Sequence, residues 1–231
     1  MYPLFFCLTY PNSIPAARTQ ILNEIAGSPP NLIEAIELDV TKPSHIDNVM
    51  KKLLGKPLAA IINNAAILQH DWNEKTFELH MDTNLRGPVR LARALLPSLK
   101  LGDGRVINLS TGLAVFTAQA KPYFDLITQA QDVDSLMKLP FIGDVGDASR
   151  DYLPYKTTKA ALNRATQLLA KSPDFEGVPV VSVCPGWVKT DMGGPNATRS
   201  VAQGAASVLA MLKPDVIETG IFTRDGKSIS F

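Results

Sequence analysis

Short β-rich segments alternate with helical segments along the chain, and this alternation limits the folds that it can adopt. An apolar run at residues 3–10 reads as a first strand, and further strands are predicted at residues 32–40, 58–63, 105–110, 178–184 and 219–222. Helices are predicted at residues 15–26, 43–54, 81–99, 154–171 and 199–212. Such alternation favours a parallel sheet covered by helices on both faces. With 231 residues, 45% of them hydrophobic, we expect one α/β domain spanning residues 1–231.

The overall charge and the cysteine content exclude several classes of function. A formal net charge of +1 and a pI near 7.7 give no basic surface for nucleic acid or an anionic membrane. The apolar run at residues 3–8 is too short to span a bilayer, and no basic region precedes it. Cys7 and Cys184 are too far apart for a CxxC or metal site, and the three histidines show no ligand spacing. We therefore expect no metal, no nucleic acid and no membrane, and reduced thiols in a cytoplasmic protein.

Small and polar residues follow four of the predicted strands. Asp39 closes the first of these, and the others are followed by residues 63–66 (Asn-Asn-Ala-Ala), 110–112 (Ser-Thr-Gly) and 185–190 (Pro-Gly-Trp-Val-Lys-Thr). Ligands of open parallel sheets bind beyond the carboxyl ends of the strands. Small residues there allow close approach of a flat ligand, and Asn, Ser and Thr supply directional hydrogen bonds. Each exit alone is also compatible with an ordinary turn.

Tyr155 and Lys159 are four residues apart in a segment predicted to be helical, so they share one face. A cation beside a phenol favours the phenolate, which makes Tyr155 a candidate general acid or base. The alternative interpretation of the same spacing is an exposed tyrosine beside a solvated lysine. Tyr152 and Lys156 have the same spacing, but Pro154 lies between them, which predicts that Tyr152 precedes the helix.

From about residue 32 to its end, the chain resembles the short-chain dehydrogenase/reductase family, which implies a Rossmann-like, doubly wound parallel sheet. Residues 63–66 resemble the family's N-N-A-G segment, with Ala66 replacing Gly. The resemblance implies a catalytic tetrad of Asn84, Ser110, Tyr155 and Lys159. It also implies a nicotinamide cofactor, NADP or alternatively NAD, held by Asp39, Val40, Asn63, Ala65, Tyr155, Lys159, Pro185, Gly186, Val188 and Thr190.

The resemblance further implies a role for each residue of the tetrad. Tyr155 gives its proton to the alkoxide that forms when hydride reaches a carbonyl carbon. Ser110 hydrogen-bonds the carbonyl oxygen, and Lys159 lowers the pKa of Tyr155 and holds the nicotinamide ribose. Asn84 anchors a water that connects Lys159 to solvent; its alternative role is a local backbone bond inside a helix. The implied substrate is a small ketone, aldehyde or alcohol.

A long insertion, at about residues 113–151, separates Ser110 from Tyr155. Its apolar residues suffice for one or two helices, lying over the site or along the helix at residues 81–99. This resembles the carbonyl-reductase-like branch of the family, where such an insertion covers the substrate and obstructs the usual interface between subunits. The implied protein is a monomer, although an insertion without a catalytic role is the alternative.

The family's first strand and its T-G-x-x-x-G-x-G turn, which meets the cofactor pyrophosphate, have no counterpart in this sequence. No glycine occurs between Thr9 and Pro15, and residues 3–10 look most like the family's second strand. We expect an N-terminally truncated sheet in which the central strand is missing and its neighbours keep unpaired edges. In the alternative arrangement, residues 3–10 form the central strand of the sheet, and residues 32–40 are its neighbour.

Two functions follow from these observations. The tetrad favours a nicotinamide-dependent oxidoreductase that reduces a ketone or aldehyde, or catalyses the reverse reaction. The missing glycine turn favours a non-catalytic binding or regulatory relative that keeps the pocket without the pyrophosphate site.

Overall fold

A computed structural model of the chain describes residues 4–8, 33–213 and 218–231. For residues 4–8 and for Ile33 it describes the backbone only. The helix predicted at residues 15–26 and the glycine-free segment between Thr9 and Pro15 lie outside the described residues.

The larger of two sheets has five strands in the order β3-β4-β5-β6-β7. β3 to β6 are parallel, and β7 pairs antiparallel with β6. The strands are β3 (Ala60–Asn63), β4 (Arg105–Leu109), β5 (Val180–Val183), β6 (Phe222–Arg224) and β7 (Lys227–Ile229). The sequence therefore predicted three of the parallel strands, β3, β4 and β5, close to their observed positions. Because these strands are parallel, their carboxyl ends share one edge of the sheet, where ligands of such folds bind.

A separate sheet of two parallel strands contains β1 (Leu4–Leu8) and β2 (Ile33–Glu37). Within the described residues, β1 pairs with β2 and not with β3. This pairing agrees with the first of the two predicted arrangements, because a strand in the central slot would pair with both neighbours. Ile62 on β3 is 41% exposed, whereas strands inside a parallel sheet are normally buried on both faces.

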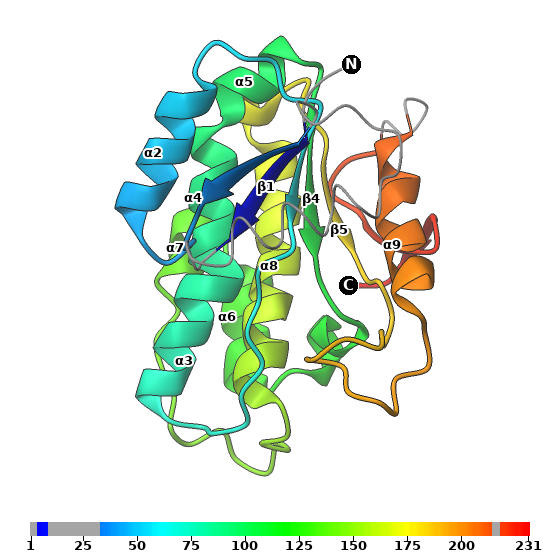
Figure 1. Cartoon of the computed structure of the whole chain (residues 1–231). Helices are drawn as coiled ribbons and strands as arrows, with labels where there is room; N and C mark the ends of the chain where they lie inside the picture. Colours follow the sequence, from blue (N-terminus) through cyan, green and yellow to red (C-terminus); the bar gives the residue numbers. More distant parts are fainter. Residues whose placement is uncertain (1–3, 9–32, 214–217) are drawn as a thin grey trace.

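Helices cover the sheet on two sides (Figure 1). α2, α4 and α8 lie on one side and α9 on the other, which is the layering expected of a doubly wound α/β fold. The helices on the first side are α2 (Pro43–Leu53), α3 (Glu74–His80), α4 (Gly87–Ala94), α5 (Leu96–Leu101) and α8 (Leu153–Lys171). α9 (Val201–Leu209) continues into a 3₁₀ turn at Ala210–Leu212. On its side of the sheet, Val208 and Met211 pack against Ile107, Val181 and Val183.

α8 begins where Pro154 and Tyr152 predict. Tyr152 adopts a left-handed conformation with φ of 54° just before the helix, and Pro154 occupies its first turn. Proline is tolerated there because the amide of that position has no intrahelical partner. Most of the helix is buried, including Tyr155, Lys159 and Leu162. Tyr155 and Lys159 are therefore not an exposed pair, and that alternative is wrong.

A π-helical turn interrupts the long helical segment that crosses the middle of the chain. The turn spans Met81–Arg86, between α3 and α4, and contains Asn84. The sequence predicted one helix at residues 81–99, but the helical segment starts earlier, at Glu74, and continues to Leu101 through two breaks. Single π turns inside α-helices occur often at functional sites. Here the turn directs Asn84 towards the loop after β3.

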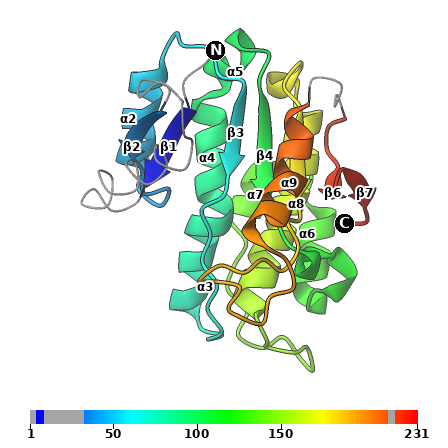
Figure 2. The ribbon, with the colours of Figure 1, turned by 45° about the vertical axis from the view of Figure 1, so that its right-hand side comes forward.

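The insertion forms two short helices, α6 (Lys121–Gln129) and α7 (Val133–Met137). Both pack against α8, and α7 also contacts the π turn at the start of the segment along which the insertion was predicted to lie (Figure 2). Tyr123 is fully buried there and meets Trp72 and Phe77 at ring-centroid distances of 5.7 and 5.6 Å. Its hydroxyl donates to the carbonyl of Pro140 at 3.0 Å and accepts from the amide of Ile142 at 2.9 Å. These contacts fix the insertion to the domain.

The strand predicted at residues 219–222 is misplaced. β6 begins at Phe222, because Gly220 turns the chain with φ of +71° and donates its amide to Val180. β6 and β7 form a hairpin whose turn is Asp225-Gly226, with φ values of 53° and 75°. Asp-Gly is a strong hairpin signal that the sequence analysis missed. Among the described residues, no helix combines the length and apolarity needed to cross a membrane.

Candidate active site

The end of β4 carries the centre of the candidate site. Tyr155, in the first turn of α8, lies close enough to Thr111 for that side chain to lower the pKa of its phenol, and Lys159 donates from Nζ to the carbonyl of Leu109 at 2.7 Å. Ser110 lies between these two contacts. The phenol, the hydroxyls and the amine that the sequence predicted to converge are thus brought together over three consecutive residues of β4 and its exit.

Tyr155 carries a protonated phenol at neutral pH. Its side chain is nearly buried, and burial raises the pKa of Tyr155 to about 12, opposed by the bond with Thr111 and reinforced by nearby Cys184. From the family resemblance, Lys159 was expected to lower this pKa. In the structure the pKa is raised instead, because the free energy lost when the phenolate leaves water exceeds the stabilisation that its neighbours provide.

Lys159 is buried and has no carboxylate partner among the described residues. Its contact with the Leu109 carbonyl is its single hydrogen bond in the described part of the chain. Burial lowers the pKa of Lys159 to about 8, because an ammonium loses its hydration there. The amine is therefore able to change its charge near physiological pH.

Ser110, the predicted hydroxyl of the tetrad, points into the protein. It is 4% exposed, and its Oγ has no hydrogen-bond partner among the described residues. Buried hydroxyls are normally paired, so an orphan at a strand end marks a position that a ligand can complete. The hydroxyl that contacts Tyr155 belongs to Thr111 instead.

Asn84 connects the loop after β3 to α8. Its amide accepts from the amide of Ile67 at 2.9 Å, donates to the carbonyl of Ile67 at 3.1 Å and donates to Thr158 Oγ1 at 3.2 Å. Thr158 in turn donates to the carbonyl of Pro154 at 2.8 Å. Asn84 therefore positions the first turn of α8, which carries Tyr155. Its predicted role in a water path to Lys159 stays a prediction.

Asn63 belongs to a chain of polar side chains inside the sheet. It donates to Asn108 Oδ1 at 2.8 Å, and Asn108 donates to Thr166 Oγ1 at 2.9 Å. Thr166 and Ser182 then share a hydrogen bond of 2.8 Å. These contacts connect β3, β4, α8 and β5. The amide of Asn63 is consequently occupied within the protein, whereas Ala65, two residues later, is exposed.

Asp39 follows β2 and closes a turn. Its Oδ1 accepts from the hydroxyl of Thr41 at 2.7 Å and from the amide of Thr41 at 3.0 Å. Partial burial opposes ionisation, but the hydrogen bonds from Thr41 and the charge of Lys42 together lower the pKa of Asp39. Val40, the next residue, packs onto Gly87, where a Cβ atom would lie 2.8 Å from Val40 Cβ. Asp39 is thus an ionised, partly exposed acceptor beyond a strand end.

The predicted nicotinamide loop at residues 185–190 is fastened to the β6–β7 hairpin by Arg199. Gly186 has φ of +80°, and a Cβ atom there would lie 2.3 Å from Cδ of Arg199. Arg199 reaches the Asp225 carboxylate with two nitrogens, at 3.1 and 2.5 Å. Thr190 accepts from the amide of Gly193 at 3.1 Å, and Val188 bridges to Arg199. The loop therefore has a defined shape.

Sequence reasoning missed Thr111 and Arg199. Thr111 was quoted as part of a strand exit, and its place directly after Ser110 was a usable signal. Arg199 had none, because its partner Asp225 is far along the chain. No group of three or more His, Cys, Asp or Glu side chains suited to a metal lies among the described residues.

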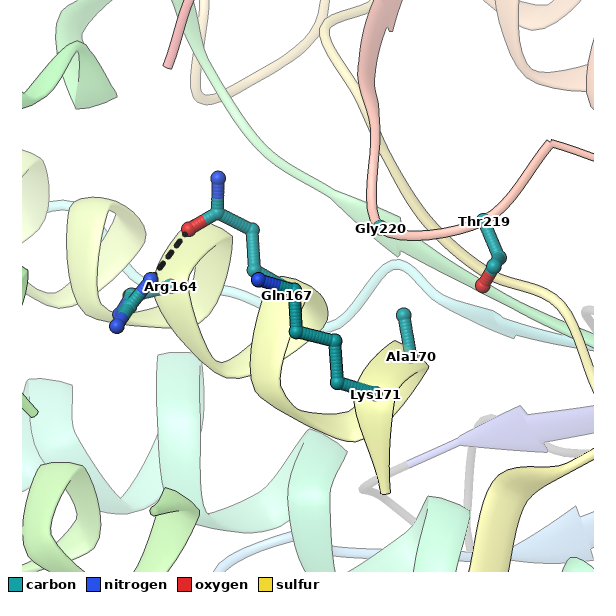
Figure 3. Close-up of a pocket in the computed structure, with 6 residues that line it drawn as sticks. All are labelled: Arg164, Gln167, Ala170, Lys171, Thr219 and Gly220. Atoms are coloured by element: carbon teal, nitrogen blue, oxygen red, sulfur yellow. Dashed lines mark hydrogen bonds between the residues drawn. The ribbon is translucent and has the colours of Figure 1, made fainter. Parts of the chain in front are cut away.

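A cavity of about 270 Å³ lies elsewhere, at the other end of α8 (Figure 3). Its lining includes Arg164, Lys171 and Gly220. Tyr155 and Lys171 are separated by about 24 Å along the helix, at about 1.5 Å per residue. Because this cavity contains none of the predicted site residues, it does not coincide with the candidate active site.

The chain is similar to known proteins over most of its length. Residues 11–123 match the family model described as short chain dehydrogenase. The chain is 30% identical over 218 residues to carbonyl reductase [NADPH] 1 of Mus musculus, covering 83% of this chain and 77% of that protein. This chain belongs to the short-chain dehydrogenase/reductase family.

Solved structures of similar proteins support the fold of this short-chain dehydrogenase/reductase. The NADPH-bound carbonyl reductase from chicken fatty liver is 26% identical, with a TM-score of 0.70, covering 99% of this chain and 88% of that one. The carbonyl reductase Sniffer of D. melanogaster is 22% identical, with a TM-score of 0.74 and the same coverage. The prediction of a Rossmann-like α/β fold is therefore confirmed.

The residues of this edge fit the nicotinamide end of a dinucleotide. The unpartnered hydroxyl of Ser110 and the ammonium of Lys159, with one protein acceptor, can each receive a ligand's polar group. Gly186, with its positive φ, leaves the space of its missing side chain to Arg199, which fixes the shape of the loop beside them. A counterpart for the pyrophosphate is not visible in the sequence, where the segment between Thr9 and Pro15 contains no glycine.

Proposed function

We propose that this chain is an NAD(P)-dependent carbonyl reductase that converts a ketone or aldehyde to an alcohol, or catalyses the reverse reaction. The observation that carries the proposal is the meeting of Tyr155, the buried Lys159 and the unpartnered hydroxyl of Ser110 at the end of β4. The relatives named carbonyl reductase [NADPH] favour NADP over NAD as the cofactor.

Tyr155 is the proposed proton donor. With its pKa raised to about 12 by burial, it holds its proton throughout the neutral range. An alkoxide is a much stronger base than a phenolate, so transfer becomes favourable as charge develops on the carbonyl oxygen. A bound reduced nicotinamide would supply the hydride.

The neighbouring polar groups stabilise the same oxygen. Thr111 is positioned to hydrogen-bond it, because it already contacts the Tyr155 hydroxyl. Ser110 remains a second candidate for this role, since its buried Oγ lacks a protein partner. Lys159 supplies positive charge in a buried place, where charges act more strongly than in water, and Asn84 positions α8.

We propose that the cofactor contacts are those predicted from the sequence, arranged from one strand end to the next. Asp39 and Val40 would hold the adenine end, and the ribose and nicotinamide would lie near Lys159 and Gly186. The full proposed set is Asp39, Val40, Asn63, Ala65, Tyr155, Lys159, Pro185, Gly186, Val188 and Thr190. For Asn63 the contact would come from backbone, because its side chain is bound to Asn108.

A second candidate is a non-catalytic relative that has lost dinucleotide binding. It is favoured by the edges of β1 and β3 that stay unpaired within the described residues, and by the absence of glycine between Thr9 and Pro15. The same chain would then bind a small carbonyl or alcohol compound without transforming it.

Binding and turnover distinguish these candidates. NADPH and NADH are titrated into the purified chain, with the fluorescence of the reduced nicotinamide as the readout, and a panel of aldehydes and ketones is then added. We expect saturable NADPH binding and loss of nicotinamide absorbance that depends on substrate. Absence of NADPH and NADH binding at millimolar cofactor rejects the reductase and supports the second candidate.

We also propose that the protein is a monomer. α6 and α7 pack on α8, a helix that otherwise offers a surface to another subunit. The buried, free thiol of Cys184 fits a reducing compartment such as the cytoplasm.

A further inference from the structure

Arg224 ends β6 at the same edge of the sheet as the candidate site. β6 is parallel to β5, so its carboxyl end lies beside the exit that leads into Pro185 and Gly186. The side chain is exposed. Its position alone would be unremarkable for a surface arginine; its contacts place it at the site.

The guanidinium of Arg224 extends over the ends of β4 and β5. One terminal nitrogen donates to Sγ of Cys184 at 3.1 Å. A Cβ atom on Gly112 would lie 2.6 Å from that nitrogen, so the missing side chain of Gly112 leaves the space that the guanidinium occupies. Gly112 directly follows Thr111, and Cys184 is close enough to Tyr155 to raise the pKa of its phenol. Arg224 is therefore one residue from the hydroxyl that contacts Tyr155.

Most of the hydrogen-bonding capacity of Arg224 is unused. A guanidinium has five N–H donors, and a thiol sulfur is a weak acceptor. Arg224 forms no salt bridge within the described part of the chain, and the adjacent carboxylate of Asp225 is bound by Arg199 instead. The result is an exposed cation, held in place by its contact with Cys184, whose natural partner is a planar anion.

We propose that Arg224 binds a carboxylate group on the substrate, so that the chain reduces aldehydes or ketones that carry an acid group in preference to neutral ones. This inference rests on the proposed carbonyl reduction and adds a substrate class to it. The carboxylate accepts from the guanidinium while the carbonyl oxygen lies at Tyr155 and Thr111. A charge-assisted contact in which two N–H groups of the guanidinium bind the carboxylate favours the acid mainly by lowering its KM.

The test compares 4-carboxybenzaldehyde with its neutral methyl ester, using NADPH as reductant. We expect the wild-type kcat/KM to be at least about tenfold higher for the acid, a difference of about 1.4 kcal/mol. Arg224→Gln is expected to lower this ratio about tenfold and to leave the ester unaffected. Gly112→Ala is expected to lower the ratio as well, because its methyl group displaces the guanidinium.

Two controls separate this contact from other effects. Lys227→Gln removes one exposed charge from the same hairpin and should leave the ratio unchanged. The Kd of NADPH should be equal in the wild type and in Arg224→Gln. A wild-type ratio near one, an unchanged ratio in Arg224→Gln, or weakened NADPH binding with no change in the ratio would overturn the proposal.

Failure of the proposed function gives a different result. If the wild type reduces neither aldehyde, carbonyl reduction is rejected, and calorimetric binding of 4-carboxybenzaldehyde decides on Arg224 by itself. Tighter binding of the acid than of the ester, lost in Arg224→Gln, supports the carboxylate site. Equal binding of the two compounds, or no loss in the variant, contradicts it.

Discussion

Two sets of polar residues meet on β4, and they differ in how completely the protein satisfies them. Inside the sheet, Asn63, Asn108, Thr166 and Ser182 form a continuous chain of hydrogen bonds. At the strand end, Ser110 Oγ has no described partner, and Lys159 has a single acceptor. The two sets are adjacent in sequence, since Asn108 and Ser110 are separated by one residue.

The difference separates structural from functional residues. A buried polar chain that is fully paired stabilises the arrangement of the elements it joins, and a ligand can gain little from it. A buried group that lacks partners is costly in the free protein and becomes favourable once a ligand supplies them. The strand-end set is therefore expected to govern turnover, and the interior set is expected to govern the free energy of unfolding.

Replacing the proposed proton donor should give the largest effect. Tyr155→Phe is expected to lower kcat/KM by about 10³-fold, because general acid catalysis contributes about 10²–10⁴. The free energy of unfolding should change by less than about 1 kcal/mol, measured by urea denaturation. Tyr152→Phe makes the same chemical change on an exposed tyrosine before α8 and should keep full activity. Comparable losses in both variants would show that Tyr155 is not specifically required.

The two hydroxyls after β4 can be ranked against each other. Thr111→Val should reduce kcat by about 10²-fold, since losing one donor to a developing oxyanion costs about 10²–10³. Ser110→Ala should cost less, because its hydroxyl does not contact Tyr155 in this structure. Steady-state kinetics of both variants decides the ranking. A greater loss in Ser110→Ala would restore the assignment predicted from the sequence.

The interior set should respond in stability rather than in activity. Asn108→Leu leaves Asn63 and Thr166 without their partner, which should lower the free energy of unfolding by about 3 kcal/mol. Below its unfolding transition, the variant should retain kcat within about twofold. Asn48→Leu, an exposed position on α2, provides the matched control. Strong loss of activity in folded Asn108→Leu would remove the distinction between the two sets.

Lys159 should make stability depend on pH with a predictable sign. Its pKa falls from 10.5 to about 8 on folding because the ammonium is buried. Between pH 8 and 10 the unfolded chain binds more protons at this position, so stability rises with pH by at most about 1.4 kcal/mol per unit. The free-energy cost of burying the charged amine is fully present below pH 8. Urea unfolding of the wild type and Lys159→Met across this range measures the difference.

The free energy of unfolding should depend on pH differently in the wild type and in Lys159→Met only if Lys159 causes that dependence. Tyr155 contributes in the opposite direction above pH 10, because its folded pKa is raised, and this range is therefore avoided. If the free energy of unfolding has the same pH slope in the wild type and in Lys159→Met, the interpretation of Lys159 as a buried, partly deprotonated amine is contradicted.

The strands and the position of Tyr155 were predictable because they rest on local patterns. β3, β4 and β5 consist of apolar runs bounded by turn residues, and Pro154 marked the start of α8. The sequence also predicted that the central position beside β3 would lack a strand, and the observed pairing of β1 with β2 alone agrees with this. These features depend on residues that are close together in the chain.

The missed features depend on contacts between distant segments. Arg224 reaches Gly112 and Cys184, which no spacing in the sequence connects. The pKa of Tyr155 was predicted in the wrong direction, because burial of the phenol in the folded chain dominates it. The β6–β7 hairpin was missed for a different reason, since its Asp225-Gly226 signal was present but not read.

The central claim, that the strand-end set is a carbonyl-reducing site, is tested most directly by following the transferred hydrogen. The purified chain is incubated with methyl 4-formylbenzoate and NADPH carrying deuterium at the transferable position of the nicotinamide, and the product is examined by NMR. The account predicts an alcohol with deuterium on its carbinol carbon, formed by the wild type and not by Tyr155→Phe. Absence of the labelled alcohol, or its formation at equal rates by both proteins, would contradict it.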